Sequence, residues 1–148
     1  MERAVELART HAIRAIVDLR EEECDDAEFL ASAGIDFLHL PTTDQFAPPR
    51  ERLDRGVEFA QQHMRRGNRV LIHCQGGIGR SPLLALCVLV AEGHEPLAAL
   101  TSSKDIRELI SPSYAQYEAW ADWLRSRGIQ PPDYHTFGCV AYRHLARG

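Results

Sequence analysis

The sequence predicts a single three-layer α/β domain in which a central, mostly parallel sheet is flanked by helices. Three short apolar runs have the length of buried strands, and stretches with helical spacing of apolar residues separate them. This alternation favours parallel strands joined by right-handed crossovers. The chain of 148 residues has a usual size for one domain, and the core is predicted to span residues 12–127.

The predicted elements follow one another along the chain. The strands, each an apolar run, are predicted at residues 12–19, 35–40 and 69–73. The helices are predicted at about residues 1–11, 25–34, 53–67, 81–91, 96–110, 113–127 and 140–146. Gly34 fits a left-handed C-cap, Gly67 closes the next helix, and Pro82 suits the first position of a helix.

Residues 73–81, His-Cys-Gln-Gly-Gly-Ile-Gly-Arg-Ser, form a glycine-rich turn between a predicted strand and a predicted helix. Such a turn directs backbone N–H groups and the positive end of the helix dipole toward an anion. Arg80 adds a planar fork that matches phosphate oxygens. Cys74 lies where the same positive field stabilises a thiolate, the nucleophilic form. The turn therefore predicts a site that binds phosphate and attacks its phosphorus.

The simplest alternative is an ordinary strand–helix turn with a buried cysteine. The spacing of Cys74 and Arg80 arises often by chance, but the preceding His73, the three glycines and the following Ser81 make this turn more specific. Two nucleotide-binding motifs are excluded, because no lysine follows the turn and the last glycine of a dinucleotide fingerprint is missing.

Residues 73–81 resemble the signature of the cysteine-dependent protein tyrosine phosphatases, and the short chain resembles their dual-specificity branch. The resemblance extends over about residues 12–127, including Val-Asp-Leu-Arg at 17–20 and the helix start at 111–117. It implies a phosphatase-type phosphate-binding loop (P-loop) between strand and helix. Members of the family usually carry further strand before the position of Ala12, where this chain has a short segment expected to be helical.

The resemblance also assigns roles to the residues of the motif. Cys74 would be the nucleophile that accepts the phosphoryl group, and His73 would favour its thiolate form. Arg80 would hold the phosphoryl oxygens, and the Ser81 hydroxyl would assist departure of the thiolate in the second step. The backbone amides that would bind the phosphate belong to Gln75, Gly76, Gly77, Ile78 and Gly79.

Asp44 matches the aspartate that the family needs upstream of the cysteine. A carboxylic acid at this place would protonate the leaving oxygen, and the resulting carboxylate would then activate water. Asp44 and Cys74 both follow predicted strands, so we expect them to meet at one edge of a parallel sheet. An aspartate that only caps a turn is the alternative. Asp36, the nearest rival, lies inside a strand and is expected to face solvent.

Gln116 is a further candidate, because the start of this late helix resembles a family segment where a polar side chain approaches the pocket. Its proposed role is to position water. The simpler interpretation is an exposed glutamine on an amphipathic helix.

The substrate class follows from charge. The P-loop contains no lysine, whereas phosphatases of phosphoinositides tend to place lysines there. An acidic run at residues 21–26 would repel polyanions, although a solvated turn is its simpler interpretation. These features favour phosphotyrosine, and also phosphoserine or phosphothreonine, in proteins. A phosphoinositide or another small phosphate ester remains an alternative substrate. The sequence is also compatible with a weakly catalytic phosphoprotein-binding module and with a rhodanese-like or arsenate-reducing enzyme.

Composition narrows partners and compartment. A net charge of −4 and a pI of about 6.0 argue against nucleic-acid or membrane-surface binding. The sequence contains no long apolar run for membrane insertion and no visible signal peptide. The proposed chemistry needs no metal or other cofactor. A catalytic thiolate needs a reducing compartment, which predicts the cytoplasm, and the oligomeric state is left open. The cysteines, without metal-ligand spacing, are Cys24, Cys74, Cys87 and Cys139.

Overall fold

A computed structural model describes residues 6, 9 and 12–145 of the chain. The helix predicted over residues 1–11 falls almost entirely outside the described residues. The elements run in the order β1 (Ile13–Arg20), α2 (Ala27–Ser32), β2 (Asp36–Thr42), α3 (Arg50–Arg65), β3 (Arg69–His73), α4 (Arg80–Ala91), α5 (Pro96–Ile106), α6 (Tyr114–Ser126) and α7 (Tyr134–Ala141).

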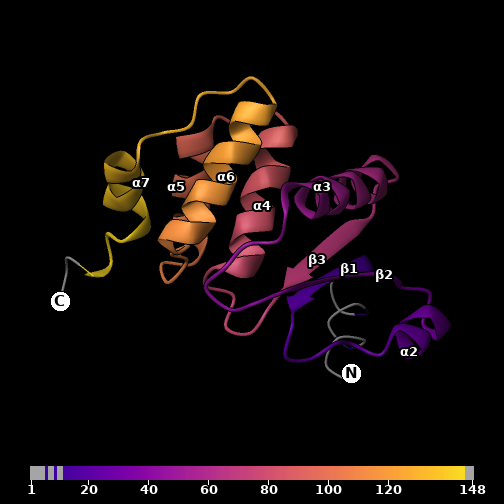
Figure 1. The fold of residues 1–148 in the computed structure, drawn as a ribbon. Helices are drawn as coiled ribbons and strands as arrows, with labels where there is room; N and C mark the ends of the chain where they lie inside the picture. Colours follow the sequence, from indigo (N-terminus) through magenta and orange to yellow (C-terminus); the bar gives the residue numbers. More distant parts are fainter. Residues whose placement is uncertain (1–5, 7–8, 10–11, 146–148) are drawn as a thin grey trace.

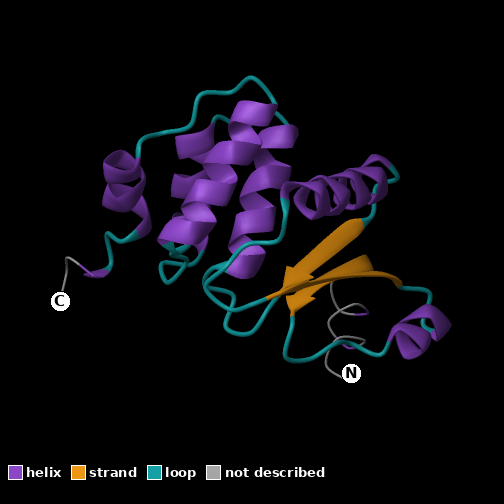
Figure 2. Ribbon diagram, viewed as in Figure 1, coloured by secondary structure: helices purple, strands orange, loops and turns teal. Residues whose placement is uncertain are grey.

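The three strands form one parallel sheet in the order β2-β1-β3, as the alternating pattern predicts (Figures 1 and 2). In the central strand, Val17 lies opposite Leu38 of β2 and Ile72 of β3. Because all three strands run in the same direction, the segments that follow β2 and β3 begin at the same edge of the sheet.

Helices cover both faces of the sheet, which confirms the three-layer arrangement. Val17 and Leu19 of β1 face the larger core, which they share with residues of α3, α4, α5 and α6. Ile13 and Ile16 face the other side, where they pack with Leu30 of α2. Alternation of side chains places Ile16 opposite Val17 and Leu19. Ile13 lies on the same side as Ile16 because the register of β1 shifts between Ile13 and Ala15. Among the described residues, no helix is long and apolar enough to cross a membrane.

Local signals explain most helix ends. Asp26 caps α2 by accepting a hydrogen bond from the Phe29 amide at 3.1 Å. Gly34 and Gly67 have φ values of 77° and 78°, the left-handed conformation expected where a helix closes. Helix α3 begins at Arg50, directly after Pro49 and three residues before the first apolar position.

Two predicted boundaries are wrong at the C-terminal half of the chain. Helix α5 ends at Ile106 instead of residue 110, because Arg107 adopts an extended conformation that turns the chain toward the P-loop. The last helix spans residues 134–141 instead of 140–146. Asp133 caps it by accepting a hydrogen bond from the Thr136 amide at 2.7 Å, and Phe137 is buried in the main core. The sequence signal that marks the true start of this helix is a cap residue directly after two prolines.

Candidate active site

The P-loop (residues 74–79) connects the end of β3 to the start of α4. Gly76 and Gly77 have φ values of 79° and 66°, which side chains other than glycine rarely adopt. The loop returns the chain so that the Ser81 hydroxyl lies 3.2 Å from the sulfur of Cys74, and the Ser81 amide donates to the same sulfur at 3.4 Å. Both groups are placed to donate hydrogen bonds to a thiolate.

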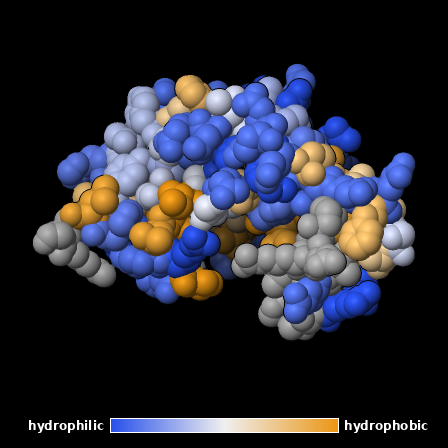
Figure 3. Space-filling model, turned by 90° about the horizontal axis from the view of Figure 1, so that it is seen from below, coloured by the Kyte–Doolittle hydropathy of each residue, from blue (hydrophilic) through white to orange (hydrophobic). Residues whose placement is uncertain are grey.

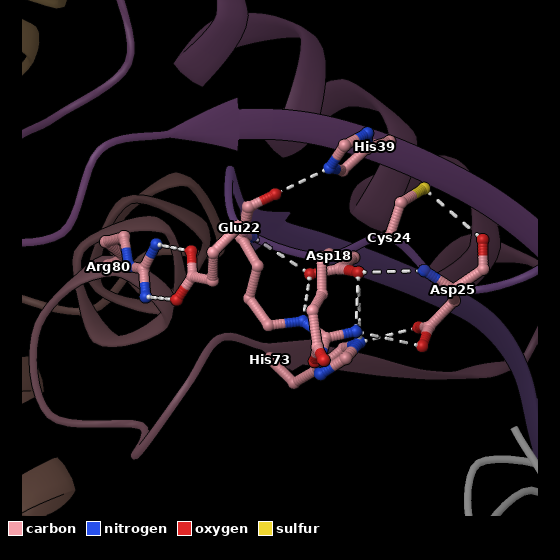
Figure 4. Close-up of polar contacts among 9 residues, drawn as sticks. Asp18, Glu22, Cys24, Asp25, His39, His73 and Arg80 are labelled. Carbon is pink, nitrogen blue, oxygen red and sulfur yellow. Dashed lines mark hydrogen bonds and ion pairs between the residues drawn. The ribbon is translucent and has the colours of Figure 1, made fainter.

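Arg80 begins α4, and its buried guanidinium makes hydrogen bonds through Nη1 and Nη2. Nη1 and Nη2 donate to the two carboxylate oxygens of Glu22 at 2.7 and 2.8 Å, and Nη1 also donates to the Thr42 carbonyl at 2.9 Å (Figure 4). Nε is buried and has no hydrogen-bond partner among the described residues. The hydrogen bonds from Arg80 lower the pKa of Glu22 to about 2. The fork is therefore fixed in place with one buried donor left unused.

Asp44 lies in the segment between β2 and α3, here called the Asp44 loop (residues 43–49). Its carboxylate is exposed, and Oδ1 lies 3.8 Å from Nε of Arg80. The same oxygen accepts the Gln45 amide at 3.0 Å. The structure thus places Asp44 beside the unused donor of Arg80. Asp36, its rival, begins β2 at the opposite edge of the sheet and accepts a hydrogen bond from His63 at 2.9 Å.

His73 ends β3 and is held by buried carboxylates. Its Nε2 lies 2.7 Å from Oδ2 of Asp25 and 3.9 Å from Oδ2 of Asp18 (Figure 4). Asp18 is fully buried and accepts hydrogen bonds from the Arg20 side chain at 2.9 and 3.0 Å. Burial raises the pKa of Asp18, but the hydrogen bonds from Arg20 outweigh burial and hold it below its ordinary value.

The acidic run at residues 21–26 is exposed apart from the half-buried Asp25, as a solvated turn predicts, but most of its carboxylates have partners. Glu22 binds Arg80, Asp25 binds His73, and Asp26 caps α2. Glu23 pairs with Arg20 at 2.6 Å. Most of these carboxylates therefore take part in a hydrogen bond or an ion pair. Sequence reasoning could not find the partner of Glu22, which lies 58 residues away along the chain.

The simpler interpretation of Gln116, an exposed helix residue, is also wrong. Gln116 is buried, accepts the Ser113 amide at 2.8 Å through Oε1, and donates to the Phe46 carbonyl at 3.0 Å through Nε2. Its amide group also packs directly against Gly79. Gln116 thereby joins α6 to the Asp44 loop and to the P-loop. The Ser-x-x-Gln pattern at residues 113–116 is a capping box, and it was a usable signal.

A cavity of about 770 Å³ opens beside the P-loop. Its wall includes Cys74, His73 and Ser81, and also Arg107, which the sequence did not single out. A larger cavity of about 1170 Å³ lies between α6 and residues 128–136 and contains none of the predicted site residues.

Two groups of side chains near the P-loop have the composition of metal ligands. One is Asp18, Asp25 and His73, and the other is Asp18, Cys24 and His39. In the first group Asp18 accepts hydrogen bonds from the Arg20 guanidinium, and in the second His39 bonds the Arg20 carbonyl at 2.6 Å. Because Asp18 and His39 are already bonded to the Arg20 side chain and main chain, these residues fit a hydrogen-bond network better than a metal site.

The site combines a half-buried cysteine with a fixed arginine on a glycine-rich loop that connects a parallel strand to a helix. This combination defines a cysteine-dependent phosphatase of the protein tyrosine phosphatase superfamily. The comparison with known families agrees. Residues 2–94 match the family described as "Polymorphic toxin system, DSP-PTPase phosphatase". The chain belongs to this family, and it resembles the dual-specificity branch of the superfamily.

Relatives and solved structures extend the likeness. The chain is 33% identical over 91 residues to the phosphatidylglycerophosphate phosphatase PTPMT1 of Arabidopsis thaliana, covering 60% of this chain and 27% of the relative. It is 28% identical over 113 residues to the phosphatidylglycerophosphatase and protein-tyrosine phosphatase 1 of Rattus norvegicus, covering 72% of this chain and 58% of the relative. The chain therefore spans less than two thirds of the length of these relatives.

Among solved structures, that of PTPMT1 is 25% identical, with a TM-score of 0.77 and 85% of each chain covered. The active form of Tk-PTP is 29% identical, with a TM-score of 0.76, covering 84% of this chain and 86% of that one. Human DUSP28, 16% identical with a TM-score of 0.74 over 84% of this chain and 86% of its own, shares the fold.

Proposed function

We propose that this phosphatase cleaves phosphate monoesters in two steps, with Cys74 as nucleophile and Asp44 first as acid and then as base. The observation that carries the proposal is the buried, unpartnered Nε of Arg80. A buried donor without a partner is costly, and a phosphoryl oxygen would satisfy it. Arg80 binds phosphate oxygens through Nε and the amides of the P-loop bind the others.

In the first step the Cys74 thiolate attacks phosphorus, and a sulfur–phosphorus bond forms while the bond to the leaving oxygen breaks. The carboxyl proton of Asp44 passes to that oxygen, so that it leaves as an alcohol or phenol. The closeness of Asp44 Oδ1 to Arg80 Nε, 3.8 Å, supports this role, because it places the acid next to the bound phosphoryl group.

In the second step the Asp44 carboxylate takes a proton from water, and the water oxygen attacks phosphorus. The sulfur–phosphorus bond breaks, releasing inorganic phosphate and the Cys74 thiolate. The Ser81 hydroxyl, 3.2 Å from the sulfur, stabilises the departing thiolate. Gln116 is proposed to act near this water, and its hydrogen bond to the Phe46 carbonyl supports a position at the Asp44 loop.

The proposed substrates are phosphotyrosine and other phosphorylated side chains of proteins. The lysine-free P-loop supports this choice. A second candidate is a non-protein phosphate ester with an apolar part. The side chains of Phe46, Ile78, Ile106 and Leu109 are exposed on the segments around the P-loop, although apolar side chains are normally buried. Figure 3, which views the side from which these loops project, shows hydrophobic groups gathered among hydrophilic ones.

The names of the relatives also support the second candidate, because two of them are phosphatases of phosphatidylglycerophosphate. The test compares a panel of phosphotyrosine peptides with dispersed phospholipid phosphomonoesters, with Cys74→Ser as the inactive control. Hydrolysis of peptides at higher kcat/KM supports the first candidate. Hydrolysis of the lipids alone would reject it in favour of the second.

A further inference from the structure

Arg107 lies against the P-loop although it belongs to a distant part of the chain. It is the first residue after α5, and its Nη2 donates to the Gly76 carbonyl at 2.6 Å. Its Nη1 lies 3.1 Å from the position that a Cβ on Gly77 would take. That position is 3.9 Å from the Ser81 hydroxyl, which in turn lies 3.2 Å from the Cys74 sulfur. Arg107 therefore lies near the sulfur of Cys74, the proposed nucleophile. Both residues line the cavity beside the P-loop.

Arg107 differs from Arg20 and Arg80, the other arginines at the site, in its ion pairing. Arg20 is bound by carboxylates at 2.6 to 3.1 Å, and Arg80 is bound by Glu22. Within the described part of the chain, the guanidinium of Arg107 has no carboxylate within 4.0 Å and makes one hydrogen bond, to a carbonyl. A guanidinium has five N–H donors, so most of those of Arg107 remain available in the cavity wall.

The segment that carries Arg107 is held in place from two sides. The amide of Ser111 donates to the Ile78 carbonyl of the P-loop at 2.9 Å. On the other side, Arg143 binds the carboxylate of Glu108 at 2.8 and 2.9 Å. A cation on a fixed segment loses less conformational entropy when it binds a ligand, so its contribution to affinity is larger.

Two carboxylates of the acidic run have arginine partners, because Glu22 pairs with Arg80 and Asp25 pairs with Arg20. We infer that Arg107 binds a second anionic group of the substrate while the scissile phosphate lies in the P-loop. The class of substrate is a phosphate monoester that carries a second phosphate or a phosphodiester, as in a small bisphosphate or a lipid headgroup. The inference rests on the proposed function and deepens it by naming what the same site selects.

The test uses three probes with the same scissile ester: inositol 5-phosphate, inositol 1,5-bisphosphate and dioctanoyl phosphatidylinositol 5-phosphate. The measured quantity is the ratio of kcat/KM for each doubly anionic probe to kcat/KM for the first. Loss of a charge-assisted hydrogen bond predicts that Arg107→Ala lowers this ratio by about 10- to 100-fold. Arg107→Lys keeps the charge but lacks the planar guanidinium. Its kcat/KM ratio should therefore lie between those of the wild type and Arg107→Ala.

Arg55→Ala is the matched control, because Arg55 is an exposed arginine on α3, outside both cavity walls. Its ratio should equal that of the wild type. Arg107→Gln, which removes the charge but keeps a polar side chain and part of the aliphatic stem, repeats the test if Arg107→Ala melts at a lower temperature. An unchanged ratio in both Arg107 variants overturns the inference.

The two doubly anionic probes separate the possible sources of the second anion. A drop confined to the lipid assigns Arg107 to a headgroup phosphodiester, and a drop with both assigns it to bisphosphates in general. A drop confined to inositol 1,5-bisphosphate overturns the headgroup assignment. Absence of wild-type turnover on every probe, including p-nitrophenyl phosphate, would instead contradict the proposed function.

Discussion

Gly79 gives the sharpest test of how the active-site segments are assembled. Its φ of −131° lies outside the left-handed region that favours glycine. A Cβ on Gly79 would, however, overlap Oε1 of Gln116 and lie 2.9 Å from its Nε2. Gln116 is buried and cannot swing into solvent without losing its bonds to Ser113 and Phe46. The effect of Gly79→Ala therefore reports on the contact with Gln116.

The magnitude follows from the bonds that must break. Loss of the two hydrogen bonds of Gln116 costs about 1–3 kcal/mol, and the overpacked Cβ adds about 1–3 kcal/mol. We expect Gly79→Ala to lower the free energy of unfolding in urea by about 2–6 kcal/mol. Because Gln116 binds the Asp44 loop, kcat on p-nitrophenyl phosphate should fall as well.

A double-mutant cycle isolates the cause. In a Gln116→Ala background there is space for the new Cβ, so Gly79→Ala should cost at least about 1 kcal/mol less than in the wild type. If Gly79→Ala costs the same in both backgrounds, the contact does not determine the requirement for glycine. Wild-type stability and activity in Gly79→Ala alone would refute the reasoning altogether.

Three further predictions concern Glu22 and Asp18 near the site and Phe137 in the main core. Glu22→Gln removes one charge-assisted partner of Arg80, and the misplaced guanidinium should lower kcat/KM by up to about 100-fold; an unchanged kcat/KM would show that Glu22 does not orient it. Asp18 has a pKa lowered below its ordinary value, so its contribution to stability is present above that ordinary value and is lost as the pH falls through the lower, folded-state pKa. Urea unfolding between about pH 5 and pH 2 should therefore depend less on pH in Asp18→Asn than in the wild type, and parallel curves would contradict this. Phe137→Ala should lower the free energy of unfolding by about 3–5 kcal/mol, because the ring is fully buried in the main core, and a change under 1 kcal/mol would place α7 outside that core.

Local patterns in the sequence were sufficient for the sheet and for most helices. The apolar runs and the glycines at positions 34 and 67 act through neighbouring residues, so their effect can be predicted without tertiary structure. The last helix was predicted at residues 140–146, whereas its start is determined by the cap residue Asp133, which lies before that segment. The cytoplasmic location stays a prediction.

The proposed site was predictable where a motif is continuous in sequence or where the family resemblance supplied a candidate. The P-loop could be found from nine adjacent residues, and the resemblance added Asp44 and Gln116, whereas Glu22 and Arg107 reach the P-loop from two other segments. Their pairing depends on how those segments pack, and nothing in the local sequence around Glu22 distinguishes it from a solvated glutamate. The electrostatic environment of the site therefore required the structure.

The most direct test of the proposed mechanism is detection of the covalent intermediate. In Asp44→Asn the second step lacks its base, whereas p-nitrophenolate leaves without needing an acid. Acid-quenched Asp44→Asn incubated with p-nitrophenyl phosphate should therefore carry one HPO3 group on the peptide that contains Cys74, as measured by mass spectrometry. The same peptide from Asp44→Asn/Cys74→Ser should carry none. Phosphate on another residue, or turnover that survives Cys74→Ser, would contradict the mechanism.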